Sequence, residues 1–219
     1  MSLHRDLIRM SLDDAGTEEP AATRERLRDH FPRGATRRMT QLGLLLGHVL
    51  LDLEPTADDT IIYASRFGET RALEAYLESF PAASPTLFQT SIQPSGVQQV
   101  LIGRQQPLRE FWPVTGHEQL VAQALTCSLL APSRRVILCG GEERGTWLLE
   151  QGVASARSFA FALALEREAL QPLARLRLVA DAAADHPALS LEGFFDSLQG
   201  RTPWLLAAPA GGVLSWTWA

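Results

Sequence analysis

Hydrophobic residues along the chain follow two periods, which predict helices and strands in turn. Apolar positions recur every three to four residues in five segments, typical of amphipathic or buried helices: 39–53, 71–80, 95–103, 120–130 and 189–199. Shorter apolar or alternating runs predict strands at 61–64, 108–114, 136–139, 157–166 and 174–180. The tail, residues 203–219, predicts a hairpin around Pro209–Gly212. This alternation indicates an α/β fold with a mixed sheet.

Two parts of the chain give weaker patterns. Residues 3–12 fit either a first strand or a short helix, residues 13–20 are acidic and loop-like, and residues 23–30 form a charged helical turn. Residues 81–90 are expected to be an irregular connection. We therefore expect the regular structure to begin near residue 35.

Composition narrows the class of protein. The chain has 219 residues, which suits one domain, and a formal net charge of −5 offers no basic footprint for nucleic acid. No apolar stretch is long enough for a membrane span, and the N-terminus lacks the apolar core of a signal peptide. Two cysteines give no disulfide framework and no cysteine-based metal site. These features together favour a cytoplasmic protein.

The common catalytic and cofactor motifs are missing from the sequence. It has no GxxxxGK[ST] or GxGxxG phosphate loop, no GxSxG elbow and no HExxH metal pair, so we expect neither a cofactor nor a metal. Two acidic pairs, Asp58–Asp59 and Glu142–Glu143, are expected to be solvated charges in exposed turns.

Few other side chains are candidates for chemistry. Cys127 and Cys139 fall on buried faces and are expected to be small hydrophobic residues rather than nucleophiles. His48 is expected at the edge of the core or as a capping residue. His117 is the single catalytic candidate, although a polar residue at the start of a helix is the favoured interpretation.

Residues 108–130 have the outline of a nucleophile elbow. A short apolar strand ends in a tight turn at Thr115, Gly116 and His117, and a helix follows. Several enzyme classes present a nucleophile on such a turn. Here neither cysteine nor serine stands at its apex.

Several segments taken in order resemble the N-terminal half of a ketosynthase of the thiolase fold. More closely, they resemble the short ketosynthase-like subunits found beside aryl-polyene and related pigment pathways. The resemblance is carried by residues 32–50, 61–69, 84–108 and 115–125, with VILCGGEE and the closing WTW. It implies a thiolase-like half with a mixed five-stranded sheet and helices packed on it. A variable segment, residues 1–31, would precede one domain, residues 32–219.

The resemblance also implies what the chain does. By register, the position of the acyl-accepting cysteine falls on Gly116, with Thr115 and His117 as neighbours, and glycine cannot form a thioester. Active members need two histidines from a C-terminal half that this chain is too short to complete. The implied role is a non-catalytic chain length factor. It would form a heterodimer with an active beta-ketoacyl-ACP synthase in a type II fatty acid or polyketide pathway, and would take part in condensation only within that complex.

The resemblance further implies how the partner docks. In thiolase-type dimers the strand before the elbow pairs with its counterpart across the two-fold axis, and the preceding helix lies beside the partner's pocket. The interface or tunnel candidates are Phe111, Trp112 and Val114 on the strand, and Gln93, Val97 and Val100 at the helix. An acyl carrier protein is a further candidate partner, and the isolated chain is a candidate homodimer.

Two other functions remain open at this point. One is an acyl-transfer or hydrolase enzyme that uses His117 or Cys139. The other is a self-associating scaffold whose working form is a homodimer.

Overall fold

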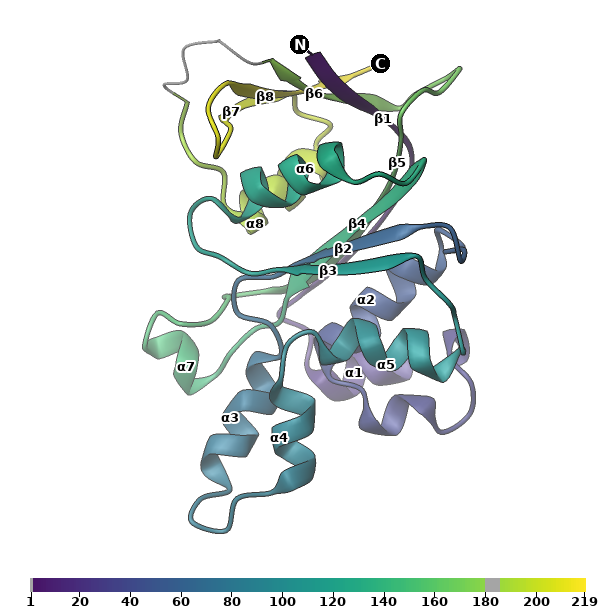
Figure 1. Ribbon diagram of the computed structural model, residues 1–219. Helices are drawn as coiled ribbons and strands as arrows, with labels where there is room; N and C mark the ends of the chain where they lie inside the picture. Colours follow the sequence, from purple (N-terminus) through teal and green to yellow (C-terminus); the bar gives the residue numbers. More distant parts are fainter. Residues whose placement is uncertain (1, 180–185) are drawn as a thin grey trace.

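A computed structural model describes residues 2–179 and 186–219, and these residues form one mixed sheet of eight strands in the order β3-β2-β4-β5-β1-β6-β8-β7 (Figure 1). The strands are β1 (Ser2–Gly16), β2 (Thr60–Ala64), β3 (Glu110–Val114), β4 (Arg135–Glu142), β5 (Ser158–Glu166), β6 (Ala174–Val179), β7 (Trp204–Ala207) and β8 (Val213–Trp218). Strand β3 lies at one edge of the sheet and β7 at the other.

The helical segments connect these strands. They are α1 (Pro20–Leu27), η1 (Arg28–His30), η2 (Ala35–Arg38), α2 (Gln41–Leu51), α3 (Thr70–Glu78), α4 (Pro85–Ser91), α5 (Ser95–Gly103), α6 (Leu120–Leu130), α7 (Trp147–Glu150) and α8 (Leu191–Gln199). No helix among the described residues is both long and apolar enough to cross a membrane.

The sheet combines two patterns of strand pairing. Strands β3, β2 and β4 are parallel, whereas β5 runs antiparallel to both β4 and β1. Strands β6, β8 and β7 then extend the sheet as antiparallel pairs beyond β1. The predicted α/β fold with a mixed sheet is confirmed, but the sheet has eight strands where we expected five. The difference arises because the last three strands join the same sheet.

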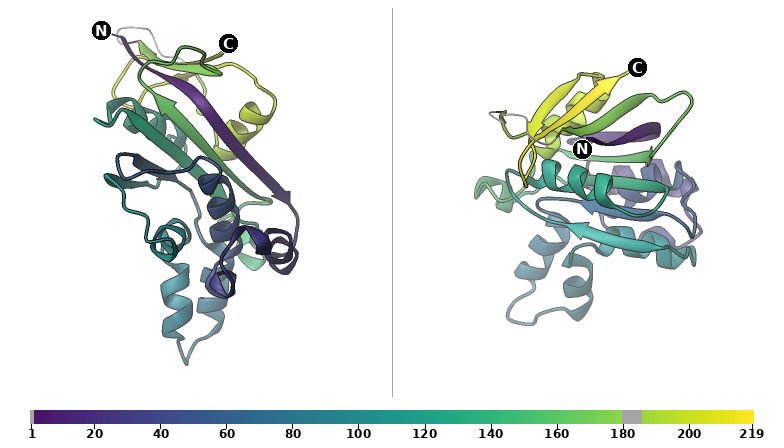
Figure 2. Two further views of the ribbon diagram at one scale, coloured as in Figure 1. Left: turned by 90° about the vertical axis from the view of Figure 1, so that its right-hand side faces the viewer. Right: turned by 45° about the horizontal axis from the view of Figure 1, so that its top comes forward.

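Strand β1 lies inside the sheet, although we set residues 1–31 apart from the domain. It pairs with β5 on one side and β6 on the other (Figure 2, where β1 is purple). Its pattern was ambiguous because two of its buried residues, Arg5 and Asp6, are charged. The predicted strand at 174–180 corresponds to β6, and its last residue, Ala180, lies outside the described residues.

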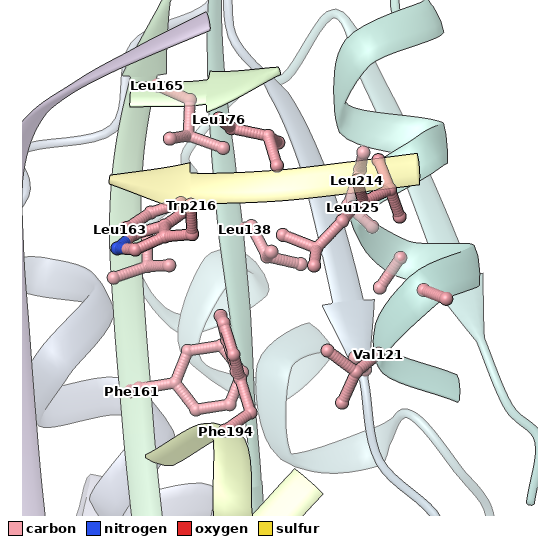
Figure 3. Packing of buried hydrophobic residues seen from close by; sticks show 14 of the residues in the cluster. Val121, Leu125, Leu138, Phe161, Leu163, Leu165, Leu176, Phe194, Leu214 and Trp216 are labelled. Carbon is pink, nitrogen blue, oxygen red and sulfur yellow. The ribbon is translucent and has the colours of Figure 1, made fainter. Parts of the chain in front are cut away.

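Helices cover the two faces of the sheet. Ile61, Tyr63 and Ile137 point into one apolar cluster with α2 and α5, whereas Ile62 and Leu138 point into the other with α6 and α8. Alternation along each strand produces this division. Figure 3 shows the second cluster, in which Val121 and Leu125 of α6 lie near side chains of β4, β5 and β8.

Helices α2 and α5 approach closely at two glycines. A Cβ atom added to Gly96 would lie 2.8 Å from the Cα of Gly43, a separation that real Cβ atoms do not adopt. Glycine at both positions therefore permits the close packing of α2 on α5. The side chain of Thr40 accepts a hydrogen bond from the Gly43 N–H and caps the start of α2.

Helix α4 was missed within the segment expected to be irregular. It begins at Pro85 after Ser84, whose side chain accepts a hydrogen bond from the Leu87 N–H at 3.4 Å. Together α3 and α4 form a hairpin that projects from the body of the molecule (Figure 2). An aromatic contact of Tyr76 on α3 with Phe88 on α4 connects the two helices, and Phe80, just after α3, also contacts Tyr76.

A buried arginine attaches β1 to the end of α6. Arg5 donates hydrogen bonds to the carbonyl oxygens of Arg134 at 2.9 Å, Ala131 at 2.6 Å and Ser133 at 2.9 Å. A cation at the C-terminal end of a helix is favourably placed. Burial, followed by the charge of Arg167, lowers the pKa of Arg5 to about 10, so the guanidinium stays charged at neutral pH.

Replacing this side chain is expected to destabilise the fold. In Arg5→Met the three carbonyl oxygens lose their donor, and we expect the free energy of unfolding to fall by about 2–4 kcal/mol. Arg177→Met, at an exposed position of β6, is the matched control, with a change of about 0.5 kcal/mol or less. Urea unfolding of both variants measures the difference, and equal losses would contradict the role given to Arg5.

Candidate functional site at the β3–α6 elbow

The elbow lies between the end of β3 and the start of α6. Thr115 and His117 are exposed and Gly116 is half-buried, as a strand-to-helix turn requires. The φ angle of Gly116 is outside the left-handed region. A Cβ atom there would meet the Gln123 Oε1 atom at 3.0 Å and Leu120 only at an ordinary distance of 3.7 Å. The backbone therefore does not demand glycine, and a small side chain fits once the flexible end of Gln123 shifts slightly.

Both cysteines lie away from the elbow turn. Cys139 is fully buried in β4, and burial raises the pKa of its thiol to about 12. Cys127 is half-buried on α6, and burial also raises the pKa of its thiol. The buried environment expected for Cys139 is confirmed. A thiol with a raised pKa supplies little thiolate, which is the reactive form.

The loop after β2 holds one side of the elbow. Because β2 and β3 are parallel neighbours, their carboxyl ends lie together. Arg66 lies 2.6 Å from His117 through its NH2 and the imidazole Nε2. A guanidinium only donates hydrogen bonds, so this imidazole nitrogen accepts. The Arg66 guanidinium also lies 4.6 Å from the centre of the Phe67 ring.

The side chain of Glu142 binds the backbone of that loop. Glu142 and Glu143 are both buried, so the expectation that they are solvated is wrong. The Oε1 of Glu142 accepts the backbone N–H of Arg66 at 2.6 Å, and its Oε2 accepts that of Phe67 at 3.0 Å. The Ser65 hydroxyl donates a third hydrogen bond at 3.2 Å. Glu142 is buried because β4 continues three residues further than the apolar run, which ends at residue 139, indicated.

Other buried glutamates bind the first turns of helices. Glu143 accepts the backbone N–H of Leu42, the second residue of α2, at 3.0 Å and of Arg71, the second residue of α3, at 2.7 Å. Glu69 accepts the N–H of Gly96, the second residue of α5, at 2.8 Å. Such N–H groups have no partner within their own helix. These carboxylates therefore satisfy donors that the helices leave open.

The three glutamates lack a cationic side chain in hydrogen-bond contact within the described part of the chain. Burial raises the pKa of Glu69, Glu142 and Glu143 to about 7 each, although the backbone hydrogen bonds oppose the rise. The charge of Glu69 adds to the rise for Glu143. No sequence motif indicated this cluster, and its members are distant along the chain.

The predictions for the remaining polar residues are partly confirmed and partly wrong. Asp58 is exposed as expected, but Asp59 is buried and forms an ion pair with Arg135. His48 lies at the edge of the core, as expected, and its Nδ1 lies 2.8 Å from an Asp13 oxygen.

The interface candidates occupy two kinds of position. Phe111, Trp112 and Val114 are half-buried on β3, whose second edge pairs with no other strand among the described residues, so they remain candidates. Val97 and Val100 of α5 are buried in the core, where they pack against α2. They are therefore not available to a partner in this conformation. Gln93 is half-buried.

The solvent-facing positions of α5 are Gln98, Ile102 and Gly103. Helical spacing placed the apolar positions on one face correctly, but that face belongs to the chain's own core. The described residues also contain no group of three or more potential metal ligands.

Comparison with solved structures gives the fold. A chain in the structure of a ketosynthase (ApeO) in complex with its chain length factor (ApeC) from Xenorhabdus doucetiae matches with a TM-score of 0.69. The match covers 98% of this chain and 99% of that chain, at 19% sequence identity. This chain has the thiolase-like ketosynthase fold. The predicted fold is thereby confirmed.

Two further structures agree. The ishigamide ketosynthase/chain length factor matches with a TM-score of 0.56 and 13% identity over 80% of this chain and 65% of that chain. A beta-ketoacyl synthase from Burkholderia phymatum matches with a TM-score of 0.55 and 14% identity, over 85% and 67%. The chain thus spans about two thirds of these two proteins. No family model matches the sequence, and no curated protein matches it.

The glutamate cluster predicts a pH-dependent stability. The folded-state pKa of about 7 for Glu69, Glu142 and Glu143 exceeds the ordinary carboxyl value of 4.5, so the folded state holds extra protons between these values. The free energy of unfolding therefore falls as pH rises through this window. His48, whose pKa is raised by its hydrogen bond to Asp13, acts in the same direction.

We expect the free energy of unfolding at about pH 5.5 to exceed that at about pH 8 by a few kcal/mol. Urea unfolding at a series of pH values measures it. The control His48→Gln removes the imidazole contribution and leaves most of the slope. Stability that increases with pH across this range would contradict the carboxyl pKa values.

Proposed function

We propose that this protein is a non-catalytic, ketosynthase-like subunit, a chain length factor, that pairs with an active beta-ketoacyl-ACP synthase. The observation that carries the proposal is the elbow. Its strand, turn and helix are complete and Gly116 has space for a side chain, yet no nucleophile is present. A subunit that keeps the shape of this site without its chemistry is suited to bind a partner that supplies the chemistry.

The solved neighbours support the pairing. One of them is a ketosynthase with its chain length factor, and another is described as a ketosynthase/chain length factor. By this likeness the pathway is a type II fatty acid or polyketide system of the aryl polyene kind. An acyl carrier protein would be the source of the acyl chain and a second partner of the complex.

The β3 edge is the surface that suits the ketosynthase. An unpaired strand edge offers backbone donors and acceptors to a second strand. Pro113 lacks an N–H group and is tolerated at an edge. Phe111 and Trp112 add aromatic anchors of the kind enriched at interfaces. Other exposed apolar residues lie on or just after α3, α4 and α5: Leu77, Phe80, Phe88, Ile92 and Ile102.

The same edge would let the isolated chain form a homodimer. A free β3 strand can pair with a second copy when the ketosynthase is absent. An acyl-transfer enzyme based on Cys139 is disfavoured, since that thiol is fully buried with a pKa of about 12. His117 has no hydroxyl or thiol in hydrogen-bond contact within the described residues, so it lacks the nucleophile that a base would activate.

Association with the ketosynthase is expected to depend on the β3 edge. The full chain and a candidate ketosynthase partner are co-expressed and separated by size exclusion. We expect Phe111→Ser with Trp112→Ser to weaken the complex at least about tenfold. Leu205→Ser, at an exposed position of the opposite edge strand β7, is the control and should leave it unchanged.

Circular dichroism confirms that each variant is folded. If the unaltered chain fails to co-elute with a ketosynthase that is fully active alone, the heterodimer is refuted. If both variants weaken the complex equally, the interface does not lie at β3.

Activity of the complex is expected not to depend on residue 116. Gly116→Ala fits the space at the elbow, so we expect condensation by the heterodimer to stay within about twofold and unfolding within about 1 kcal/mol. Gly116→Cys should react with iodoacetamide, whereas the unaltered chain should not be labelled at Cys139. A large loss of condensation in Gly116→Ala, in a complex that still forms, would assign the turn a direct role.

A further inference from the structure

Three leucines are exposed where α6 leads into β4 and where β5 leads into β6. Leu130, the last residue of α6, is 61% exposed, Leu170 is fully exposed and Leu173 is 39% exposed. The last two belong to the connection between β5 and β6, residues 167–173, which projects from the molecule (Figure 1). A single exposed leucine is ordinary, but a group of them marks a binding surface.

Hydrogen bonds hold the segments that carry these leucines side by side. The guanidinium of Arg167 donates to the carbonyl oxygens of Ala131 at 3.4 Å and Pro132 at 3.3 Å, directly after α6. The carbonyl oxygen of Leu173 accepts the N–H of Ala219, at the end of β8, at 3.0 Å. The three leucines therefore belong to one surface, although they lie on separate segments of the chain.

Exposed arginines lie among these leucines. The side chain of Arg134 is 86% exposed and pairs with Glu166 at 3.7 Å. Arg167 is also exposed, and its guanidinium binds the carbonyl oxygens named above without a carboxylate partner within the described residues. Glu168 is exposed beside it, so these two arginines face two glutamates. The arginines bring positive charge next to each apolar segment.

A hollow of about 370 Å³ adjoins this surface between the β5–β6 connection, β6 and β8. Its lining includes Pro172, Arg175, Arg177, Ser215 and Thr217. Asp6 neutralises Arg175 through a hydrogen bond of 2.7 Å. Arg177 is exposed, and neither its guanidinium nor the hydroxyls of Ser215 and Thr217 have a side-chain partner within the described part of the chain. The hollow thus presents open donors, and Arg177 gives this end of the molecule an excess of positive charge.

We propose that this end of the molecule binds the surface of an anionic membrane and lies on it without crossing it. The exposed leucines enter the boundary between headgroups and acyl chains, as apolar residues of interfacial segments do. The arginines bind lipid phosphates, which suit the planar guanidinium fork. One headgroup phosphate occupies the hollow beside Arg177. We call this surface the leucine–arginine end, and its members are Leu130, Arg134, Arg167, Leu170, Leu173 and Arg177.

A lipid surface suits the leucine–arginine end better than a second protein does. Its apolar side chains stand on separate segments with arginines between them. A folded partner would need a rigid complementary shape around each of these side chains, whereas a fluid lipid layer admits them one by one and offers a phosphate to each arginine. A second copy is disfavoured as well, because a two-fold contact at this end would bring like charges together.

The proposal is independent of the proposed function. The leucine–arginine end is built from α6, β6 and the segments that follow α6 and β5, and it contains no residue of β3. Membrane binding and pairing with a ketosynthase can therefore be tested separately.

The test mixes the full chain with vesicles of phosphatidylglycerol and phosphatidylcholine and measures the bound fraction by flotation. We expect binding at least about fivefold tighter than to phosphatidylcholine alone, and weaker as salt is added. Leu170→Ser with Leu173→Ser should weaken binding at least about tenfold and leave its salt dependence unchanged. Arg134→Glu with Arg177→Glu should weaken it at least about tenfold and remove most of the preference for anionic lipid.

Two control variants change exposed residues elsewhere. Val153→Ser removes an apolar side chain after α7, and Arg33→Glu reverses a charge between η1 and η2. Both should bind the vesicles within about twofold of the unaltered chain. Circular dichroism confirms that every variant is folded.

The proposal is overturned if the unaltered chain does not bind the anionic vesicles, or if either double variant binds them as tightly as it does. Full displacement by soluble glycerol phosphate would show that the hollow takes a free phosphate ester rather than a membrane, and would overturn it as well. So would a homodimer in vesicle-free buffer that the Leu170 and Leu173 variant abolishes, since the leucines would then bind a second copy. Failure of the unaltered chain to pair with a ketosynthase in size exclusion refutes the proposed function and leaves the vesicle result standing.

Discussion

The arrangement of this fold depends on buried glutamates that bind the starts of its helices. Glu143 accepts hydrogen bonds from the backbone N–H groups of the second residues of α2 and α3, and Glu69 accepts one from the second residue of α5. Glu74 repeats the contact at α7, where it accepts the N–H of Leu148, again the second residue. Each helix begins with N–H groups that water cannot reach at this depth. A carboxylate satisfies them with two strong acceptors, and its desolvation is the cost that raises the carboxyl pKa.

The elbow derives its shape from the same contacts. Glu142 fixes the loop after β2, and that loop places Arg66 beside His117 at the turn before α6. At the other end of α6, Arg5 binds the carbonyl oxygens that follow the helix. The helix is therefore held at both ends by groups outside the turn itself. None of these contacts uses the side chain at residue 116, so the geometry of the turn is independent of whether a nucleophile is present.

The sequence predicted the regular elements well and the buried charges poorly, for a physical reason. Period and length identify helices such as α6 and strands such as β4, because each is amphipathic or apolar over its own length. Glu143 looked like a loop charge, since its partner Leu42 is 101 positions away and leaves no local trace. Arg5 made the strand pattern of β1 ambiguous for the same reason, because its carbonyl partners are far away along the chain. Val97 and Val100 were correctly spaced, but spacing alone does not tell whether an apolar face meets the chain's own core or a partner.

The elbow also raises the question of whether a surface serves the chain's own fold or a partner. If the turn were held only by a catalytic residue, we would expect its backbone to relax in a chain that lacks that residue. The relaxed backbone at Gly116 could then have a conformation that only glycine adopts. Instead its φ is ordinary and a side chain has room. The support comes from Glu142, Arg66 and Arg5. Of these, Glu142 and Arg5 are buried, and their costly desolvation is not required for chemistry within this chain. A costly, preorganised turn next to a free strand edge is better explained by recognition, because a rigid surface loses less entropy when a partner binds.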